Sequence, residues 1–275
     1  MRRLYSVAFW LFFCTTCVVM FCIGLVLFVV TLPFDPNGRA QHLFSCFWAQ
    51  LYFYCNPRWR LRVSNRDRIP WKGPAVIVSN HESLGDVLVL FGLYRPFKWV
   101  SKASVFKMPF LGWNMSLNRY VPLVRGNPES IAKMMSECET WLRRGVPVLL
   151  FPEGTRSDDG NVKAFKDGAF KLAIKMQVPI IPLALTGTAR TLPKHGFLLE
   201  KSADCHVSVM EPVSVAPFGE DVAALRDHVR DLIIAEKRRV LGESPAISTP
   251  VPSSAGDGGS VCGVTPARTS QAELS

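Results

Sequence analysis

The chain opens on a long apolar stretch. Between Arg3 and Asp35 there is no charged residue, and residues 7–30 are mostly Phe, Val, Leu, Cys and Ile. About 20 apolar residues are enough for a helix to cross a bilayer. A cleavable signal peptide would have a shorter apolar region of about 7–15 residues, followed by small residues. This stretch is longer and ends in Leu32-Pro-Phe-Asp35, so we expect a retained membrane anchor.

A second apolar stretch, residues 43–54, is rich in aromatic residues. Basic residues lie before the first stretch, at Arg2 and Arg3, and again after the second, between Arg58 and Lys72. Basic flanks favour the cytoplasmic side of a membrane. Both flanks can lie there if the two stretches form a helical hairpin, or if the second lies at the membrane interface, where aromatic residues are favoured. The alternative is that residues 43–54 form a core helix.

Short β-branched runs then alternate with amphipathic helical patterns. Strands are predicted at 75–78, 97–101, 120–124, 146–151, 180–185 and 206–210, and helices at 86–93, 128–144, 167–176 and 221–240. This alternation predicts an α/β fold, with a largely parallel mixed sheet flanked by helices. Ser, Pro, Gly, Ala and Thr dominate the end of the chain, which is typical of disorder. We therefore expect membrane-anchoring helices at 1–56, an α/β domain at 57–242 and a disordered tail at 243–275.

The net charge of +10 indicates an anionic partner, such as nucleic acid, anionic lipid or a phosphorylated substrate. Because the basic residues are dispersed and no nucleic-acid motif is present, we do not expect nucleic acid. The eight cysteines show no paired spacing that would indicate a disulfide framework. Cys14 and Cys17 form a CxxC pair inside the apolar stretch without further metal ligands nearby, so we expect no metal site there.

A polar cluster, Asn80-His-Glu-Ser-Leu-Gly-Asp86, directly follows the predicted strand 75–78. Ligands of open α/β sheets gather at the carboxyl ends of strands, which makes His81 a candidate base and Asp86 its orienting partner. Five helical residues turn by about 500°, so the two side chains cannot share one face of a regular helix. They can meet only if His81 lies in a loop and Asp86 in the first helical turn. The alternative is a purely structural pair.

A second polar cluster, Pro152-Glu-Gly-Thr-Arg-Ser157, follows the predicted strand 146–151. Gly154 allows a tight turn or the close approach of a ligand, and the planar fork of Arg156 suits a phosphate. Arg125 follows another strand and would lie at the same edge of the sheet. Lys163 and Lys166 add positive charge to this region. Together these groups suit a substrate with a hydroxyl to activate and a phosphate to bind; the alternative is a Glu–Arg salt bridge that closes the turn.

These clusters resemble conserved blocks of one enzyme family. Asn80–Asp86 resembles the NHx4D block of the glycerolipid acyltransferases, typified by the lysophosphatidic acid acyltransferase (1-acylglycerol-3-phosphate O-acyltransferase) family, and Phe151–Ser157 resembles their FPEGTRS block. Three looser segments occur in the expected order, namely Lys102–Gly112, Val121-Pro-Leu-Val-Arg125 and Val178-Pro-Ile-Ile-Pro182. The resemblance covers roughly residues 62–212.

The resemblance implies the glycerolipid acyltransferase fold and transfer of a fatty acyl group from a thioester to the free hydroxyl of lysophosphatidate, giving phosphatidate in phospholipid synthesis. His81 would act as general base, oriented by Asp86, without an acyl-enzyme. No metal or bound cofactor is implied, and acyl-CoA or acyl carrier protein would be the co-substrate. With Lys166, which we add for its charge, the acceptor-binding positions would be Arg125, Glu153, Gly154, Thr155, Arg156 and Lys166.

The expected partners are therefore a lysophospholipid acceptor, an acyl thioester donor and membrane lipids, with the active domain on the cytoplasmic face of a membrane. The chain departs from the family pattern at Asn118-Arg119, where Gly is common, and at Val124, where Asp often precedes the Arg. Arg119 either contacts a headgroup or points to solvent. Glycerol 3-phosphate, another lysophospholipid or a lyso-aminolipid are the alternative acceptors. A non-catalytic, membrane-associated basic protein is the alternative from another class.

Overall fold

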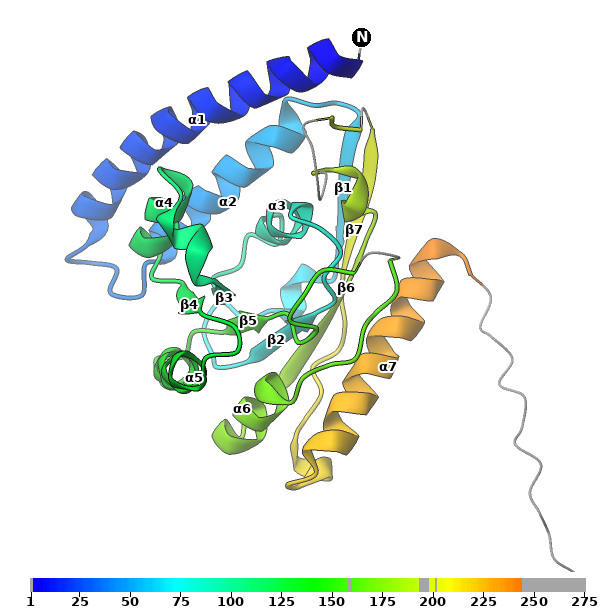
Figure 1. Cartoon of the computed structure of the whole chain (residues 1–275). Helices are drawn as coiled ribbons and strands as arrows, with labels where there is room; N and C mark the ends of the chain where they lie inside the picture. The colour runs from blue at the N-terminus through cyan, green and yellow to red at the C-terminus, as the bar shows by residue number, and fades with distance from the viewer. Residues whose placement is uncertain (1, 158–159, 193–197, 201, 244–275) are drawn as a thin grey trace, which may run out of the picture. The chain divides into compact units, whose positions relative to one another are not determined.

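A computed structural model describes residues 2–157, 160–192, 198–200 and 202–243, which belong to one compact unit (Figure 1). Within these residues a seven-stranded sheet has the order β1-β7-β6-β2-β5-β3-β4. Strands β6, β2, β5, β3 and β4 are parallel, whereas β7 runs antiparallel to β6 and β1 runs parallel to β7. The predicted largely parallel mixed sheet is thus confirmed. The strands are β1 (Trp59–Ser64), β2 (Val76–Ser79), β3 (Lys98–Lys102), β4 (Val121–Leu123), β5 (Val148–Leu150), β6 (Ile180–Thr186) and β7 (Ala203–Val209).

Helices cover both faces of this sheet (Figure 1). One face is covered by α1 (Arg2–Thr31), α2 (Arg39–Tyr54), α3 (Gly85–Phe91) and α4 (Leu111–Leu117). The other face is covered by α5 (Pro128–Arg143), α6 (Gly168–Met176) and α7 (Val222–Leu241). Short 3-10 helices complete the described elements: η1 (Arg66–Arg68), η2 (Ala103–Lys107), η3 (Thr188–Arg190) and η4 (Ala216–Phe218).

The buried strands follow from their sequences. Successive side chains of a strand point to opposite faces of the sheet. In β2, Ile77 packs into one core and Val76 and Val78 into the other, and all three side chains are fully buried. Continuous apolar strands of this kind are typical of a parallel sheet with helices on both faces. The sheet order then places the carboxyl ends of β2 and β5 side by side, so the two polar clusters that follow them are neighbours.

Helix α1 packs on the domain along one side and exposes apolar residues on the other. On its packed side, the Phe9 ring lies 5.3 Å from the Trp59 ring, and Thr16 Oγ1 lies 2.9 Å from the Tyr52 hydroxyl. On its outer side, Leu11 and Val26 are each 65% exposed. Of the helices that the structure describes, α1 is the one whose length and apolar composition would allow it to cross a membrane.

Helix α2 covers the second apolar stretch and contributes to the core. Cys46, Trp48, Tyr52 and Phe53 are all buried, which fits the core-helix alternative for residues 43–54. The predicted division of the chain at residue 56 stays a prediction. Apart from Glu243, the predicted disordered tail lies outside the described residues.

The sequence patterns did not predict β1 or α4. Arg60 and Arg62 are exposed on β1, so this segment has the composition of a basic membrane flank rather than of a buried strand. Its partner is β7, with Trp59 opposite Ala203 and Ser64 opposite Ser208. An exposed edge strand tolerates charged residues, so its sequence lacks the apolar, β-branched pattern of a buried strand. This segment is a strand because it pairs with β7.

Candidate active site

His81 and Asp86 face each other at the carboxyl end of β2. His81 lies in the loop after β2, and Asp86 lies in the first turn of α3, so the helix begins between them. His81 Nδ1 and Asp86 Oδ2 are 2.6 Å apart, and the Asp86 side chain is completely buried. An Nδ1–H that donates to Asp86 leaves Nε2 as the free acceptor of the imidazole. This is the arrangement that a histidine needs to remove a proton from a hydroxyl.

Backbone groups of the same loop fix the Asp86 carboxylate. Its Oδ2 also accepts hydrogen bonds from the backbone N–H of Glu82, at 2.7 Å, and of Ser83, at 3.1 Å. Ser83 is itself used structurally, because its Oγ donates to Thr188 O at 2.8 Å and accepts from Gly85 N at 2.9 Å. The loop therefore holds Asp86 in one position and leaves His81 as the reactive group.

The second polar cluster holds His81 from the neighbouring strand. The backbone N–H of His81 donates to Glu153 Oε1 at 2.8 Å, and His81 O accepts from Ser157 N at 2.8 Å. The imidazole stacks on the Phe151 ring, with centroids 4.2 Å apart. The two polar clusters therefore form one site.

Glu153 has a different environment from the one expected for a salt-bridged turn. Its second oxygen, Oε2, accepts from Lys163 N at 3.1 Å, and burial raises the pKa of its carboxyl group. Glu153 and Arg156, both of which the structure describes, form no ion pair with each other. The sequence suggested an acceptor-binding role for Glu153. The structure shows a buried carboxylate that ties the His81 loop to the turn after β5, a function that the motif alone did not reveal.

Positive charge gathers around this turn. Gly154 has φ +70°, and Lys166 Nζ lies 3.0 Å from the position that a Cβ atom on Gly154 would occupy. Lys163 Nζ donates to Arg156 O at 2.7 Å. Arg156 Nη1 is buried without a hydrogen-bond partner among the described residues, and a ligand or water normally satisfies such a donor. Thr155 is exposed beside them. The turn can therefore receive an anion.

Arg125 lies at the same edge of the sheet but not beside His81. It follows β4, which is separated from β2 by β5 and β3, so three interstrand spacings of about 4.8 Å place it roughly 14 Å away. Arg125 is exposed. The structure thus brings Glu153, Gly154, Arg156 and Lys166 together with His81, and leaves Arg125 at the far end of the same edge.

Lys237 of α7 reaches this site, although nothing in its local sequence indicates this. Its Nζ contacts Glu82 Oε1 and Gly160 O, and the Lys237 and Glu82 side chains are only 12% and 7% exposed. Thr188 Oγ1 donates to the other Glu82 oxygen at 3.2 Å. Burial raises the pKa of Glu82, and the positive charge of Lys237 opposes this rise. The last helix is thereby joined to the residue next to His81.

Arg119 contacts another part of the chain, and its expected contact with a headgroup or with solvent stays a prediction. Its Nη1 donates to Pro36 O at 2.6 Å, so it binds the segment between α1 and α2. Within the described residues no group of three or more His, Cys, Asp or Glu side chains could hold a metal ion. The expectation that no metal or bound cofactor takes part stays a prediction.

The chain is similar in sequence to known acyltransferases. A family model described as Acyltransferase matches residues 60–186. A chloroplastic 1-acyl-sn-glycerol-3-phosphate acyltransferase of Arabidopsis thaliana is 34% identical over 209 residues, which are 74% of this chain and 58% of that protein. One of Brassica napus is 33% identical over 227 residues, 80% of this chain and 64% of that protein. The chain thus spans less than two thirds of the length of either plant relative.

A solved structure is similar over most of the chain. The crystal structure of the 1-acyl-sn-glycerophosphate acyltransferase of Thermotoga maritima superposes with a TM-score of 0.73 and 25% identity. The match covers 90% of this chain and 100% of the other. The fold around His81 is therefore shared with a protein of that name.

Proposed function

Because this chain belongs to the acyltransferase family that contains the 1-acyl-sn-glycerol-3-phosphate acyltransferases, we propose that it acylates the free hydroxyl of lysophosphatidate. The acyl donor is a thioester of coenzyme A or of acyl carrier protein, and the product is phosphatidate. The observation that carries the proposal is the 2.6 Å pair between His81 Nδ1 and Asp86 Oδ2 at the carboxyl end of β2.

His81 Nε2 removes the proton of the acceptor hydroxyl as its oxygen attacks the thioester carbonyl. The new C–O bond forms, the C–S bond breaks, and the leaving thiolate takes up the proton from the imidazolium. Asp86 stabilises the imidazolium while it exists. No acyl-enzyme forms, and Ser83 Oγ is already engaged in two hydrogen bonds.

The acceptor phosphate binds at the positive turn after β5. Arg156 and Lys166 supply charge there, while Gly154 and Thr155 leave room for the phosphate to approach. Arg125 contacts the acceptor from the β4 side of the same edge. Glu153 takes part by holding the backbone of His81 rather than by binding phosphate, since a carboxylate would repel it.

The protein acts at a membrane, with its active domain on the cytoplasmic face. Membrane association is supported by α1, whose outer side exposes large apolar residues, and by the net charge of +10, which favours anionic lipid. The arginines that follow α2 favour the cytoplasmic face.

An acylation assay that crosses donors with acceptors tests this proposal. The purified full chain is given acyl-CoA or acyl carrier protein thioesters with lysophosphatidate, glycerol 3-phosphate, other lysophospholipids or a lyso-aminolipid. We expect the fastest turnover with lysophosphatidate. If only another acceptor is acylated, that acceptor is the substrate of the same reaction. If no acceptor is acylated, the non-catalytic alternative is favoured.

Variants connect the turnover to the site. His81→Ala and Asp86→Asn should each lower kcat by roughly 10²–10⁴-fold, the usual contribution of general base catalysis. His228→Ala, which removes an exposed histidine of α7, is the matched control and should retain activity. Melting temperatures of all three variants establish that the fold is intact. Full activity of a folded His81→Ala variant would exclude the mechanism.

A further inference from the structure

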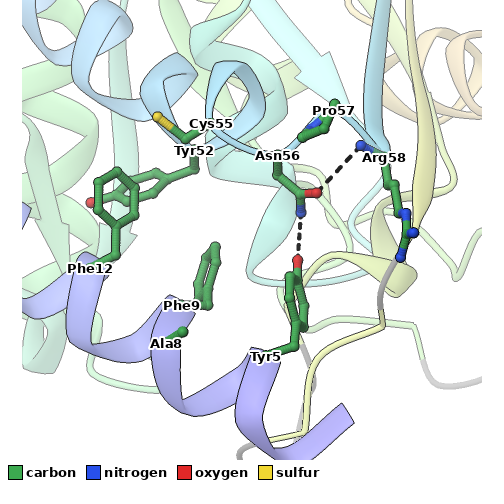
Figure 2. Close-up of a pocket in the computed structure, with 9 residues that line it drawn as sticks. All are labelled: Tyr5, Ala8, Phe9, Phe12, Tyr52, Cys55, Asn56, Pro57 and Arg58. Carbon is green, nitrogen blue, oxygen red and sulfur yellow. Dashed lines mark hydrogen bonds between the residues drawn. The ribbon is translucent and has the colours of Figure 1, made fainter. Parts of the chain in front are cut away.

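A cavity of about 530 Å³ lies between α1 and the segment that joins α2 to β1 (Figure 2). None of the residues that line it belongs to the site around His81. Its volume is within the usual range of ligand pockets, about 300–1,000 Å³. The lining residues are Tyr5, Ala8, Phe9 and Phe12 from α1, and Tyr52, Cys55, Asn56, Pro57 and Arg58 from the end of α2 and the following turn.

One end of the cavity presents hydrogen-bond donors and a positive charge. Asn56 Nδ2 donates to the Tyr5 hydroxyl oxygen at 2.5 Å, which leaves the hydroxyl proton of Tyr5 available for another acceptor (Figure 2). The Arg58 guanidinium is paired with no carboxylate among the described residues. Donors and a cation without an acidic partner suit an anion with several acceptor oxygens.

The rest of the cavity is apolar. Phe9 and Phe12 of α1 contact the Tyr52 ring, with ring centroids 6.0 and 5.9 Å away, so the three rings form one continuous apolar wall (Figure 2). Leu4 and Leu11, which lie about one helical turn from Ala8 on α1, are 75% and 65% exposed. The cavity therefore adjoins the exposed apolar side of α1. Its apolar wall begins next to the end that carries Arg58.

We propose that this cavity binds one anionic phospholipid of the bilayer. Its phosphate is held by Arg58 and the Tyr5 hydroxyl, and one acyl chain lies along Phe9, Phe12 and the Tyr52 ring. The positive charge of Arg58 favours a lipid with an anionic headgroup. The apolar wall favours a ligand that has an acyl chain over a free anion such as inorganic phosphate. The bound lipid bridges α1 and the start of β1, so it stabilises the attachment of α1 to the domain. This lipid is a structural ligand and is not acylated.

Lipid binding to the detergent-solubilised full chain tests the proposal without any turnover. Native mass spectrometry and melting temperature are measured with phosphatidylglycerol, with phosphatidylcholine and with inorganic phosphate. We expect phosphatidylglycerol to bind roughly tenfold more tightly than phosphatidylcholine and to raise the melting temperature. Both lipids carry the phosphate, but the choline cation of phosphatidylcholine is repelled by Arg58. Inorganic phosphate should give no stabilisation.

Two pairs of variants locate the lipid. Arg58→Gln should lose roughly tenfold in phosphatidylglycerol affinity, whereas Arg60→Gln, an exposed arginine two residues further along that does not line the cavity, should not. Ala8→Trp fills the apolar part and should block the lipid, whereas Leu4→Trp on the same helix should not. Equal binding of both lipids, equal stabilisation by inorganic phosphate, or unchanged affinity in Arg58→Gln and Ala8→Trp would each overturn the proposal. Because no acyl transfer is measured, such a failure leaves the proposed enzyme activity untouched.

Discussion

Lys237, near the end of α7, contacts Glu82, the residue that follows His81 in the loop after β2. Both side chains are largely buried, and Lys237 also contacts Gly160 O beyond the turn that holds His81. An ion pair in this position joins the last helix of the domain to the base that we assign to catalysis. It therefore helps to hold the loop that carries His81.

Replacing Lys237 should damage both stability and catalysis. Lys237→Met leaves the buried Glu82 carboxylate without its cation, a change that typically costs about 3–5 kcal/mol. The loop then shifts, so kcat should fall more than KM changes, while Lys237→Arg should retain most of both. Urea unfolding and steady-state kinetics measure these effects.

A double variant separates the ion pair from simple loss of packing. Adding Glu82→Gln to Lys237→Met removes the uncompensated charge, so the double variant should be more stable than Lys237→Met alone. If the two losses of unfolding free energy simply add, the pair does not couple as the geometry indicates.

Gly154 offers a test of the positive turn. Gly154→Ala and Gly242→Ala both place a side chain at positive φ, +70° and +73°, so each should lose about 1 kcal/mol of stability. Only at Gly154 would the new Cβ come within 3.0 Å of Lys166 Nζ, whereas nothing lies within 4 Å at Gly242. The KM for lysophosphatidate should therefore rise in Gly154→Ala alone. Equal KM values in the two variants would mean that Lys166 takes no part in binding the acceptor.

Lys98 is a buried lysine on β3, away from the candidate active site. Its Nζ donates to Asn118 O at 2.6 Å and lies 4.6 Å from the centre of the Trp141 ring. Burial lowers the pKa of Lys98 to about 7; Arg119 lowers it further and Asp35 opposes the change. Folding therefore disfavours the protonated form of this side chain.

This depressed pKa predicts a pH-dependent stability. An unfolded lysine keeps its proton up to about pH 10.4, so between about pH 7 and 10 the unfolded state binds more protons than the folded state. The contribution of Lys98 to the free energy of unfolding should therefore rise by up to about 1.4 kcal/mol per pH unit. Urea unfolding from pH 6.5 to 9.5 should show this rise in the parent chain and in Lys102→Met, an exposed control, but not in Lys98→Met. The same slope in Lys98→Met would assign it to other groups.

Charged substitutions on α1 test its contact with lipid. Val26 and Val29 are 65% and 61% exposed in the structure, so Val26→Glu and Val29→Glu should leave the melting temperature in detergent unchanged. An acidic group in an apolar membrane region costs about 2–3 kcal/mol, so the membrane partition coefficient measured by vesicle flotation should fall at least tenfold. Ile131→Glu on α5, another exposed apolar position, is the control. Deleting the helix is a less selective test, because Phe9 and Met20 belong to the core.

The sequence predicted the elements whose determinants are local. β2, β5 and β6 are continuous apolar runs, and α5 begins at Asn127-Pro128, where the Asn127 side chain caps the helix by accepting from Ser130 N. The contact between His81 and Asp86 could also be predicted from the sequence. It depends only on their separation of five residues and on a helix that begins between them.

The remaining contacts of the site depend on tertiary structure. Glu153 reaches His81 only because β2 and β5 pair in one register, across 72 residues of sequence. Lys237 reaches Glu82 across 155 residues, through the packing of α7 on the sheet. No spacing rule applies at such separations. The motif therefore contains Glu153 without revealing what it binds, and no motif includes Lys237.

The position of β1 in the sheet also has a consequence for synthesis of the chain. Its neighbour is β7, and about half of the chain separates Trp59 from its partner Ala203. At about 5–20 residues per second, β1 leaves the ribosome roughly 7–30 seconds before β7 has been synthesised. During that interval its backbone groups are open to other strands, a common origin of aggregation, and the charges of Arg60 and Arg62 oppose such pairing. Arg60 and Arg62, which made this segment resemble a membrane flank, can thus protect β1 from aggregation until β7 has been synthesised.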